Sequence, residues 1–197
     1  MTDDPKGTLH RYLLVAHDTL LWKLDGLGEY DVRRPMTPTA TNLLGIVKHM
    51  SMVTAGYFGG VFDRPFPDPP AWFDHDTPNA DMWATADETR DDILGLYRRA
   101  WEHADATIAA LTLESEGTVP WWGPENNPVT LHRVLTHVVA EANRHNGHAD
   151  ILRELIDGSA GLREAVSNLP DWDEVRWDAH RREVEDAARA AAAKPTA

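Results

Sequence analysis

The sequence predicts an all-α protein. Four long stretches repeat apolar residues at steps of three and four, the spacing that places side chains on one face of a helix. No stretch alternates apolar and polar residues convincingly, as a half-buried strand would, and no repeat period is present. We therefore expect a helical bundle with long connections. No linker divides the 197 residues, so one domain should cover residues 1–197, with the bundle over about 8–160.

The first two helices are expected over residues 8–27 and 38–58. In both segments leucines and other apolar residues fall on one face, and two glycines stand at the end of each segment. Thr37 would cap the second helix, with Pro38 as its first residue, because proline suits the first helical position.

Residues 60–84 have a different composition. Five prolines forbid a continuous helix there, and five aromatic residues stand among them. A long connection in a compact domain is usually functional or disordered, and the aromatics favour a packed cover. The segment is therefore expected to form a lid.

The third helix is expected over about 86–111, where Thr85 begins a capping box. A second long connection leads to Thr130, which would cap a fourth helix over about 131–156 that ends at a glycine. A C-terminal helical extension over about 170–190 and an alanine-rich tail complete the chain.

Composition narrows the classes of function. The formal net charge of −13 disfavours nucleic acid and anionic membranes as partners. No apolar run approaches the length of a membrane span, and the N-terminus has no signal-peptide pattern, so we expect a cytoplasmic protein. The chain has no cysteine, so any thiol chemistry must take its sulfur from a small molecule.

One motif stands out on the fourth predicted helix. Glu141, His145 and His148 are spaced four and three apart, so they share a helix face. They continue the apolar stripe of that helix and should point into the bundle, as His49 should on the second helix. Buried imidazoles and carboxylates are costly unless they are paired or bind a metal.

Two interpretations of these four residues remain open from the pattern alone. They form either a hydrogen-bonded polar network or a divalent-metal site, since imidazole and carboxylate are ligand types for such metals. His137 would support the site or face solvent. Trp121 and Trp122, just before the fourth helix, would line the mouth of a pocket and contact a bound cofactor.

Two segments carry a family resemblance. They are Leu43-Leu-Gly-Ile-Val-Lys-His49-Met50, and Glu141-xxx-His145-Asn-Gly-His148-Ala-Asp-Ile-Leu-Arg-Glu154. Together they resemble the DinB-like superfamily, in particular its actinobacterial members. The resemblance implies a four-helix bundle that binds a divalent metal, zinc or nickel. Its ligands would be His49, Glu141 and His145. Many members have His at position 141 and Gln at position 148, so His148 would be a fourth ligand, a supporting group or an alternative to Glu141.

The resemblance also implies a function. Relatives include mycothiol- and bacillithiol-dependent transferases and mycothiol-dependent isomerases, and they frequently form homodimers. The implied activity is a metal-dependent S-transfer, in which mycothiol or a similar small thiol attacks a small-molecule substrate beneath the lid. His148 or His75 would move protons.

Two other functions use the same residues. A non-catalytic bundle would bind a small ligand, or hold a structural metal with four protein ligands that include His148. A hydrolase would use hydroxide on the metal and turn over esters or amides without a thiol.

Overall fold

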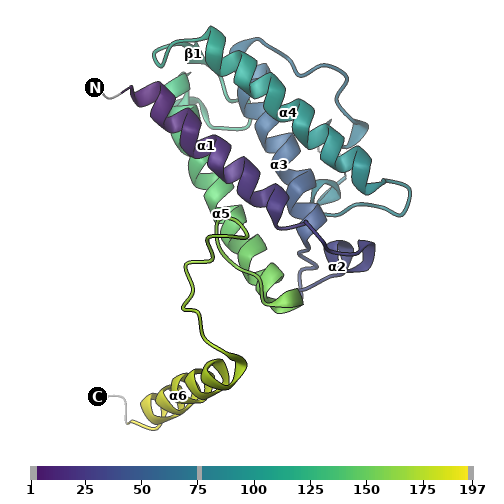
Figure 1. Ribbon diagram of the computed structural model, residues 1–197. Coiled ribbons are helices and arrows are strands. Elements are labelled where there is room, and N and C mark those ends of the chain that lie inside the picture. The colour runs from purple at the N-terminus through teal and green to yellow at the C-terminus, as the bar shows by residue number, and fades with distance from the viewer. Residues whose placement is uncertain (1–3, 75–76, 195–197) are drawn as a thin grey trace. The chain divides into compact units, whose positions relative to one another are not determined.

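The computed structural model describes residues 4–74 and 77–194 and consists mainly of helices (Figure 1). The chain divides into two compact units, residues 1–167 and 168–197. The predicted all-α class is confirmed, and the DinB-like bundle lies in the first unit. That one domain covers the whole chain stays a prediction.

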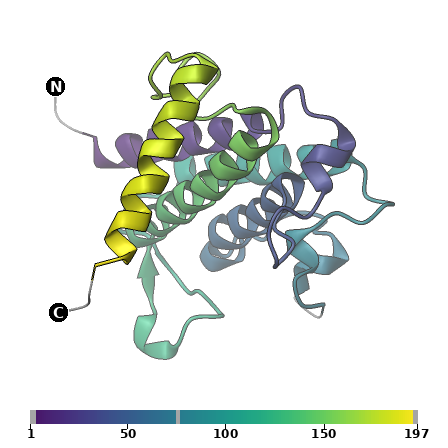
Figure 2. The same cartoon turned by 90° about the horizontal axis from the view of Figure 1, so that it is seen from below.

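Four long helices build the bundle: α1 (Pro5–Trp22), α3 (Leu43–Phe58), α4 (Arg90–Ala110) and α5 (Leu131–Asp157). Helix α3 packs against both α4 and α5, and α1 packs along α5. Figures 1 and 2 show these helices side by side along much of their length. This arrangement places one face of α3 opposite α5, which matters for the site described below.

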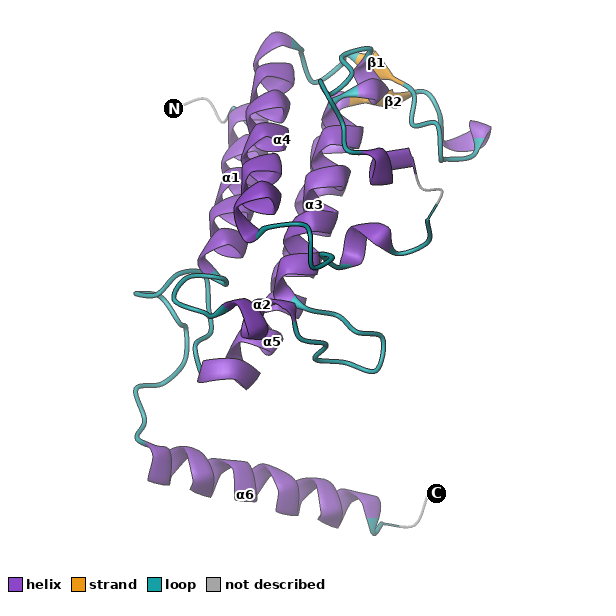
Figure 3. Cartoon of the chain, turned by 90° about the vertical axis from the view of Figure 1, so that its right-hand side faces the viewer, coloured by secondary structure: helices purple, strands orange, loops and turns teal. Residues whose placement is uncertain are grey.

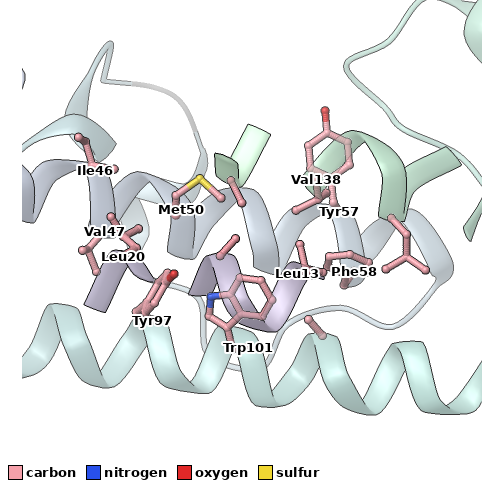
Figure 4. Close-up of a cluster of buried hydrophobic side chains, with 14 of the residues drawn as sticks. Leu13, Leu20, Ile46, Val47, Met50, Tyr57, Phe58, Tyr97, Trp101 and Val138 are labelled. Atoms are coloured by element: carbon pink, nitrogen blue, oxygen red, sulfur yellow. The ribbon is translucent and has the colours of Figure 1, made fainter. Parts of the chain in front are cut away.

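The core between these helices is apolar and contains several aromatic rings (Figure 4). The spacing of three and four residues places each helix's apolar side chains on its inner face. Each fully buried side chain of the size of leucine contributes about 1.5–3 kcal/mol to stability relative to an exposed one. The labelled core residues with 3% exposure or less are Leu13, Leu20, Ile46, Val47, Met50, Phe58, Tyr97, Trp101 and Val138.

Shorter elements connect the helices. Helix α2 (Glu29–Arg33) follows α1, and three 3₁₀ turns lie in the predicted lid: η1 (Gly60–Phe62), η2 (Ala71–Asp74) and η3 (Ala80–Met82). Strands β1 (Glu116–Gly117) and β2 (Val129–Thr130) form an antiparallel pair before α5, with η4 (Pro124–Asn126) between them (Figure 3). Strands of two residues are too short to show an alternating pattern, so no sequence signal predicts them.

The start of the second predicted helix was wrong. Helix α3 begins at Leu43, and its N-cap is Asn42, whose side-chain oxygen accepts a hydrogen bond from the Gly45 amide at 2.8 Å. Thr37 accepts from the Thr41 amide at 3.1 Å and so closes a turn before the helix. Ala40 has a φ of 66°, which a right-handed helix does not permit.

The start of the third helix also differs from the prediction. Helix α4 begins at Arg90, and its capping box is formed by Thr89 and Asp92. The predicted box at Thr85 does exist as a contact, since the Glu88 carboxylate accepts from the Thr85 amide at 2.8 Å. It lies in the turn before the helix.

The fourth helix agrees closely with the prediction. Thr130 caps α5 by accepting a hydrogen bond from the Arg133 amide. Gly158 ends the helix in the left-handed conformation, with a φ of 81°. Local signals therefore fixed the helix that carries most of the candidate site.

The second unit contains helix α6 (Glu174–Ala192), capped by the Asp173 side chain. None of its side chains is buried. Trp172 packs its ring 4.8 Å from that of Trp177 and 5.3 Å from that of His180, between ring centres. The expected C-terminal helix therefore forms, although it begins and ends a few residues later than predicted.

Among the helices that the structure describes, none is long and apolar enough to cross a membrane.

Candidate metal centre and the cavities beside it

The structure brings three of the predicted site residues together. His49 on α3 faces His145 on α5, with ring centres 4.7 Å apart. Glu141 lies one helical turn before His145, and its Oε2 is 3.4 Å from His145 Nε2. Two imidazoles and a carboxylate from two packed helices therefore share one place.

These side chains differ in burial. The side chain of His145 is 6% exposed, that of His49 is 21% exposed and that of Glu141 is 32% exposed. His148 is exposed, so the expectation that it points into the bundle is wrong.

The reason is a small error in the predicted stripe. The buried face of α5 is formed by Val138, Ala142, His145, Ala149 and Leu152. Positions 141 and 148 flank this face at its edge. His148 nonetheless stays close, because its ring centre is 5.4 Å from that of His145.

A carboxylate holds the His49 ring in place. His49 Nδ1 donates to Asp81 Oδ2 at 2.5 Å, and both side chains are largely buried. The carboxylate fixes the proton on Nδ1 and leaves the Nε2 lone pair free, an arrangement common for histidines that bind metals. Asp81 belongs to η3 in the predicted lid. It is a site residue that the sequence did not indicate, since no spacing connects it to His49.

His145 is held neutral at physiological pH. Burial is the largest of the effects that lower its pKa to about 4, and the nearby His49 and Arg144 add to it. Its Nδ1 is buried, and no described residue hydrogen-bonds to it. A neutral imidazole with an unpaired ring nitrogen can bind a cation or a small polar group.

The residues can be tested against the metal that the resemblance implies. Among the residues that the structure describes, no group of three His, Asp or Glu side chains already has a metal-binding arrangement. Their chemistry nevertheless fits: His49 has an oriented ring, His145 has a neutral ring with an unpaired nitrogen, and Glu141 supplies a carboxylate. This donor set suits zinc or nickel.

Two cavities flank the site, and both are lined by His49 and Glu141. We call the first, of about 670 Å³, the threonine cavity and the second, of about 770 Å³, the aromatic cavity. The threonine cavity is also lined by Thr37, Thr39, Thr41, Asn79, Met82, Arg144, His145, His148, Ile151 and Leu152. The aromatic cavity is also lined by Met52, Val53, Gly56, Tyr57, Phe73, Trp121 and His137.

The aromatic cavity continues outward. A third cavity of about 840 Å³, which we call the outer cavity, shares Trp121 and His137 with it and extends to Trp122 and Arg133. Aromatic and polar side chains therefore line both cavities from His49 to the surface.

The two predicted tryptophans lie at this opening. Trp121 is 54% exposed and donates its indole N–H to the Tyr57 hydroxyl at 3.3 Å. Trp122 packs edge-on against His137, with 5.1 Å between ring centres, and the Arg133 guanidinium stands over its ring. His75, the remaining predicted site residue, lies outside the described residues.

In this chain, histidines and a carboxylate from two helices meet beside ligand-sized cavities, and the helical architecture is that of a DinB-like bundle. The model of the mycothiol S-transferase family matches residues 8–158, and the chain belongs to that family. No curated protein sequence matches the chain. Family membership confirms the resemblance and supports a thiol-related transferase function on a small molecule.

Proposed function

We propose that the protein is a metal-dependent S-transferase that joins mycothiol, or a similar small thiol, to an electrophilic small molecule. The observation that carries this proposal is the meeting of His49, Glu141 and His145 beside two cavities, in a chain of the mycothiol S-transferase family. The chain has no cysteine of its own, so the nucleophilic sulfur comes from the cosubstrate.

His49, Glu141 and His145 are the proposed ligands of zinc or nickel. A divalent cation bound there would lower the pKa of a thiol and so supply a thiolate at neutral pH. Asp81 keeps the His49 ring oriented, and burial keeps His145 uncharged and ready to bind.

The thiol is proposed to lie along the aromatic and outer cavities. Mycothiol carries its thiol on a cysteinyl group joined to a sugar unit, whose rings have an apolar face and a rim of hydroxyls. Trp121 and Trp122 offer flat apolar surfaces, while Asn126 and Arg133 offer polar groups at the rim. Trp121 and Trp122 therefore have the proposed role of binding the cosubstrate.

Proton movement is proposed for histidines outside the ligand set. His148 is exposed and lines the threonine cavity, so it can exchange the thiol's proton with solvent. His75 belongs to the lid segment, and its proposed role as a second proton carrier rests on that position in the sequence.

Two proposals concern the protein's setting. A cytoplasmic location is supported by the need for a reduced small thiol. A homodimer is supported by large apolar side chains exposed on α1 and α5, helices that pack side by side: Tyr12, Val15, Ile151 and Leu155. Light scattering on the purified protein measures the second.

The first experiment measures metal and turnover together. Protein purified without chelator should contain about one metal ion per chain and should accelerate conjugation of mycothiol to a chromogenic electrophile. Glu141→Gln should lower metal content and rate, whereas Glu154→Gln, the same change at an exposed position of α5, should not. Wild-type protein with no metal would refute the metal-dependent mechanism.

The same preparation separates the other two functions. A structural site would hold its metal with four protein ligands, so His148→Ala would release the metal, and added thiol would not be consumed. A hydrolase would cleave a chromogenic ester at the same rate with and without mycothiol. Rate acceleration that requires the thiol excludes both alternatives.

A further inference from the structure

The threonine cavity has an unusual charge balance for this protein. Glu141 is its only acidic lining residue among those that the structure describes, while Arg144 and three histidines also line it. The chain as a whole has a net charge of −13. A cavity lined by one arginine and a single carboxylate therefore contrasts with the strongly acidic chain as a whole.

The Arg144 guanidinium makes only long contacts with its neighbours. Its Nη1 is 3.9 Å from Glu141 Oε2, at the limit for an ion pair, and 3.5 Å from His145 Nε2. Its side chain is 61% exposed. If Glu141 serves a metal, Arg144 keeps no carboxylate partner among the described residues.

Three threonine hydroxyls in a row also line the cavity. The Thr37 and Thr39 hydroxyls lie 3.1 Å apart, and those of Thr39 and Thr41 lie 3.4 Å apart. The turn that Thr37 closes with the Thr41 amide keeps them together. Hydroxyls can donate to an oxygen anion, and the Asn79 side chain on the same cavity can do so as well.

The aromatic cavity has no comparable group. Its polar lining residues besides His49 and Glu141 are Tyr57, Trp121 and His137, and no arginine or lysine is among the described residues that line it. The two cavities meet at His49 and Glu141 from different sides, so they offer separate places for two reactants.

We propose that the threonine cavity binds the electrophilic substrate through a carboxylate, with Arg144 as the residue that determines this specificity. Arginine presents a planar fork of donors that matches a carboxylate. The threonine hydroxyls bind the remaining oxygen lone pairs. This inference rests on the proposed S-transferase function and names the class of its acceptor: a small carboxylic acid with an electrophilic carbon close to the acid group.

The chemical step balances without a further reactant. The thiol gives its proton to solvent, and its sulfur forms a bond to the electrophilic carbon. The bond from that carbon to the leaving group breaks, and the leaving group departs with the electron pair. The carboxylate stays ionised throughout, so Arg144 binds it equally before and after the transfer.

The test uses two acceptors of similar shape and different charge, iodoacetate and iodoacetamide. Each is mixed with mycothiol and the metal-loaded full-length protein, and the rate is divided by the rate without protein. The chain has no cysteine, so neither reagent finds a protein thiol to alkylate. We expect the acceleration for iodoacetate to exceed that for iodoacetamide by about tenfold, the value of one good charged contact.

Variants assign that preference to one residue. Arg144→Gln should bring the ratio of the two accelerations close to one, and Arg144→Lys should retain part of it because the charge remains but the fork is lost. Arg99→Gln removes the same charge from an exposed position on α4 and should keep the wild-type ratio. Equal acceleration of both reagents by wild-type protein would overturn the carboxylate inference and leave the S-transferase function standing.

A binding measurement covers the case in which neither reagent is accelerated, which would refute the proposed function. Saturation-transfer NMR with crotonate and crotonamide needs no turnover. Crotonate should give the stronger signal with wild-type protein, and Arg144→Gln should abolish the difference. Equal signals from both compounds, or a preference that survives in Arg144→Gln, would sink the inference by itself.

Discussion

The contact between Asp81 and His49 gives the sharpest prediction about the site. In Asp81→Asn the side-chain oxygen can still accept the His49 Nδ1 proton, but the negative charge is lost. The substitution therefore keeps the shape of the contact and weakens its electrostatic part. We expect His49 to become a poorer metal ligand and the affinity for zinc to fall.

The magnitude follows from the geometry. The two atoms are 2.5 Å apart, and the side chains are 21% and 17% exposed, so water screens the pair only partly. Carboxylates behind metal-binding histidines contribute about 10–100-fold to metal affinity. A partly screened pair should lie near the middle of that range, at a factor of about 30, or about 2 kcal/mol.

The assay is competition for zinc against a chromophoric chelator, measured on chelator-stripped protein. Asp87→Asn provides the control, because it makes the same charge change at an exposed position six residues away. Zinc affinity within about twofold of wild type in Asp81→Asn would refute the reasoning. It would mean that the His49–Asp81 pair is a structural contact of the lid.

Three further substitutions test the fold and the cavities. Asp150→Ala should lower the free energy of unfolding by about 3 kcal/mol in urea denaturation, because it leaves the wholly buried Lys23 ammonium without its carboxylate at 2.6 Å; replacing both residues with apolar ones should cost less. Burial lowers the pKa of His17, so the unfolded chain takes up the proton first, and the free energy of unfolding should fall as the pH drops below about 6.5, the ordinary pKa of histidine. His17→Gln should flatten that slope, and an unchanged slope would contradict the assignment. Gly56→Ala puts a Cβ 3.3 Å from a carbon of the Trp121 indole and should raise the KM for mycothiol severalfold without loss of stability. Gly95→Ala is the control and should leave the KM unchanged, because its Cβ would lie 3.6 Å from the nearest side-chain atom.

The sequence predicted the helix that carries most of the candidate site because its signals are local. Thr130 and Gly158 act on the backbone within a few residues of themselves, and the structure has both caps as expected. The spacing of Glu141 and His145 fixes their shared face in any α-helix. These features depend little on the rest of the fold, so a single sequence contains them.

The start of α3 could not be predicted in the same way. Thr37-Pro38 is typical of a helix start, but threonine and proline also suit a tight turn. Asn42 competes for the same role five residues later and caps α3. The choice between the two depends on how the loop packs, since the Asn42 amide also reaches the Met82 carbonyl at 3.4 Å, far along the chain.

The prediction that a capping box at Thr85 begins the third helix failed for a related reason. Glu88 accepts from the Thr85 amide as the pattern requires, but its carboxylate also binds Lys48, a buried lysine of α3, at 2.8 Å. A charge placed to neutralise a buried ammonium is fixed by tertiary structure. Helix α4 then begins after Thr89, where a second capping box is formed by Thr89 and Asp92 within the helix start itself.

The same distinction explains which parts of the candidate site stayed hidden. Residue type and helical spacing indicate the candidate residues, and the family resemblance selects His49, Glu141 and His145 among them as ligands; only the packing of α3 on α5 is left to the fold. Asp81 and the threonine cavity depend on where two irregular segments fold back onto those helices, and no periodicity describes such segments. In the sequence nothing distinguishes Asp81 from the other acids of a chain with 32 acidic residues. Only the structure places its carboxylate oxygen 2.5 Å from the His49 ring. The proposed metal-binding residues were therefore visible in the helices, whereas the carboxylate beside His49 and the threonines of the proposed substrate cavity became visible only when the loops were placed.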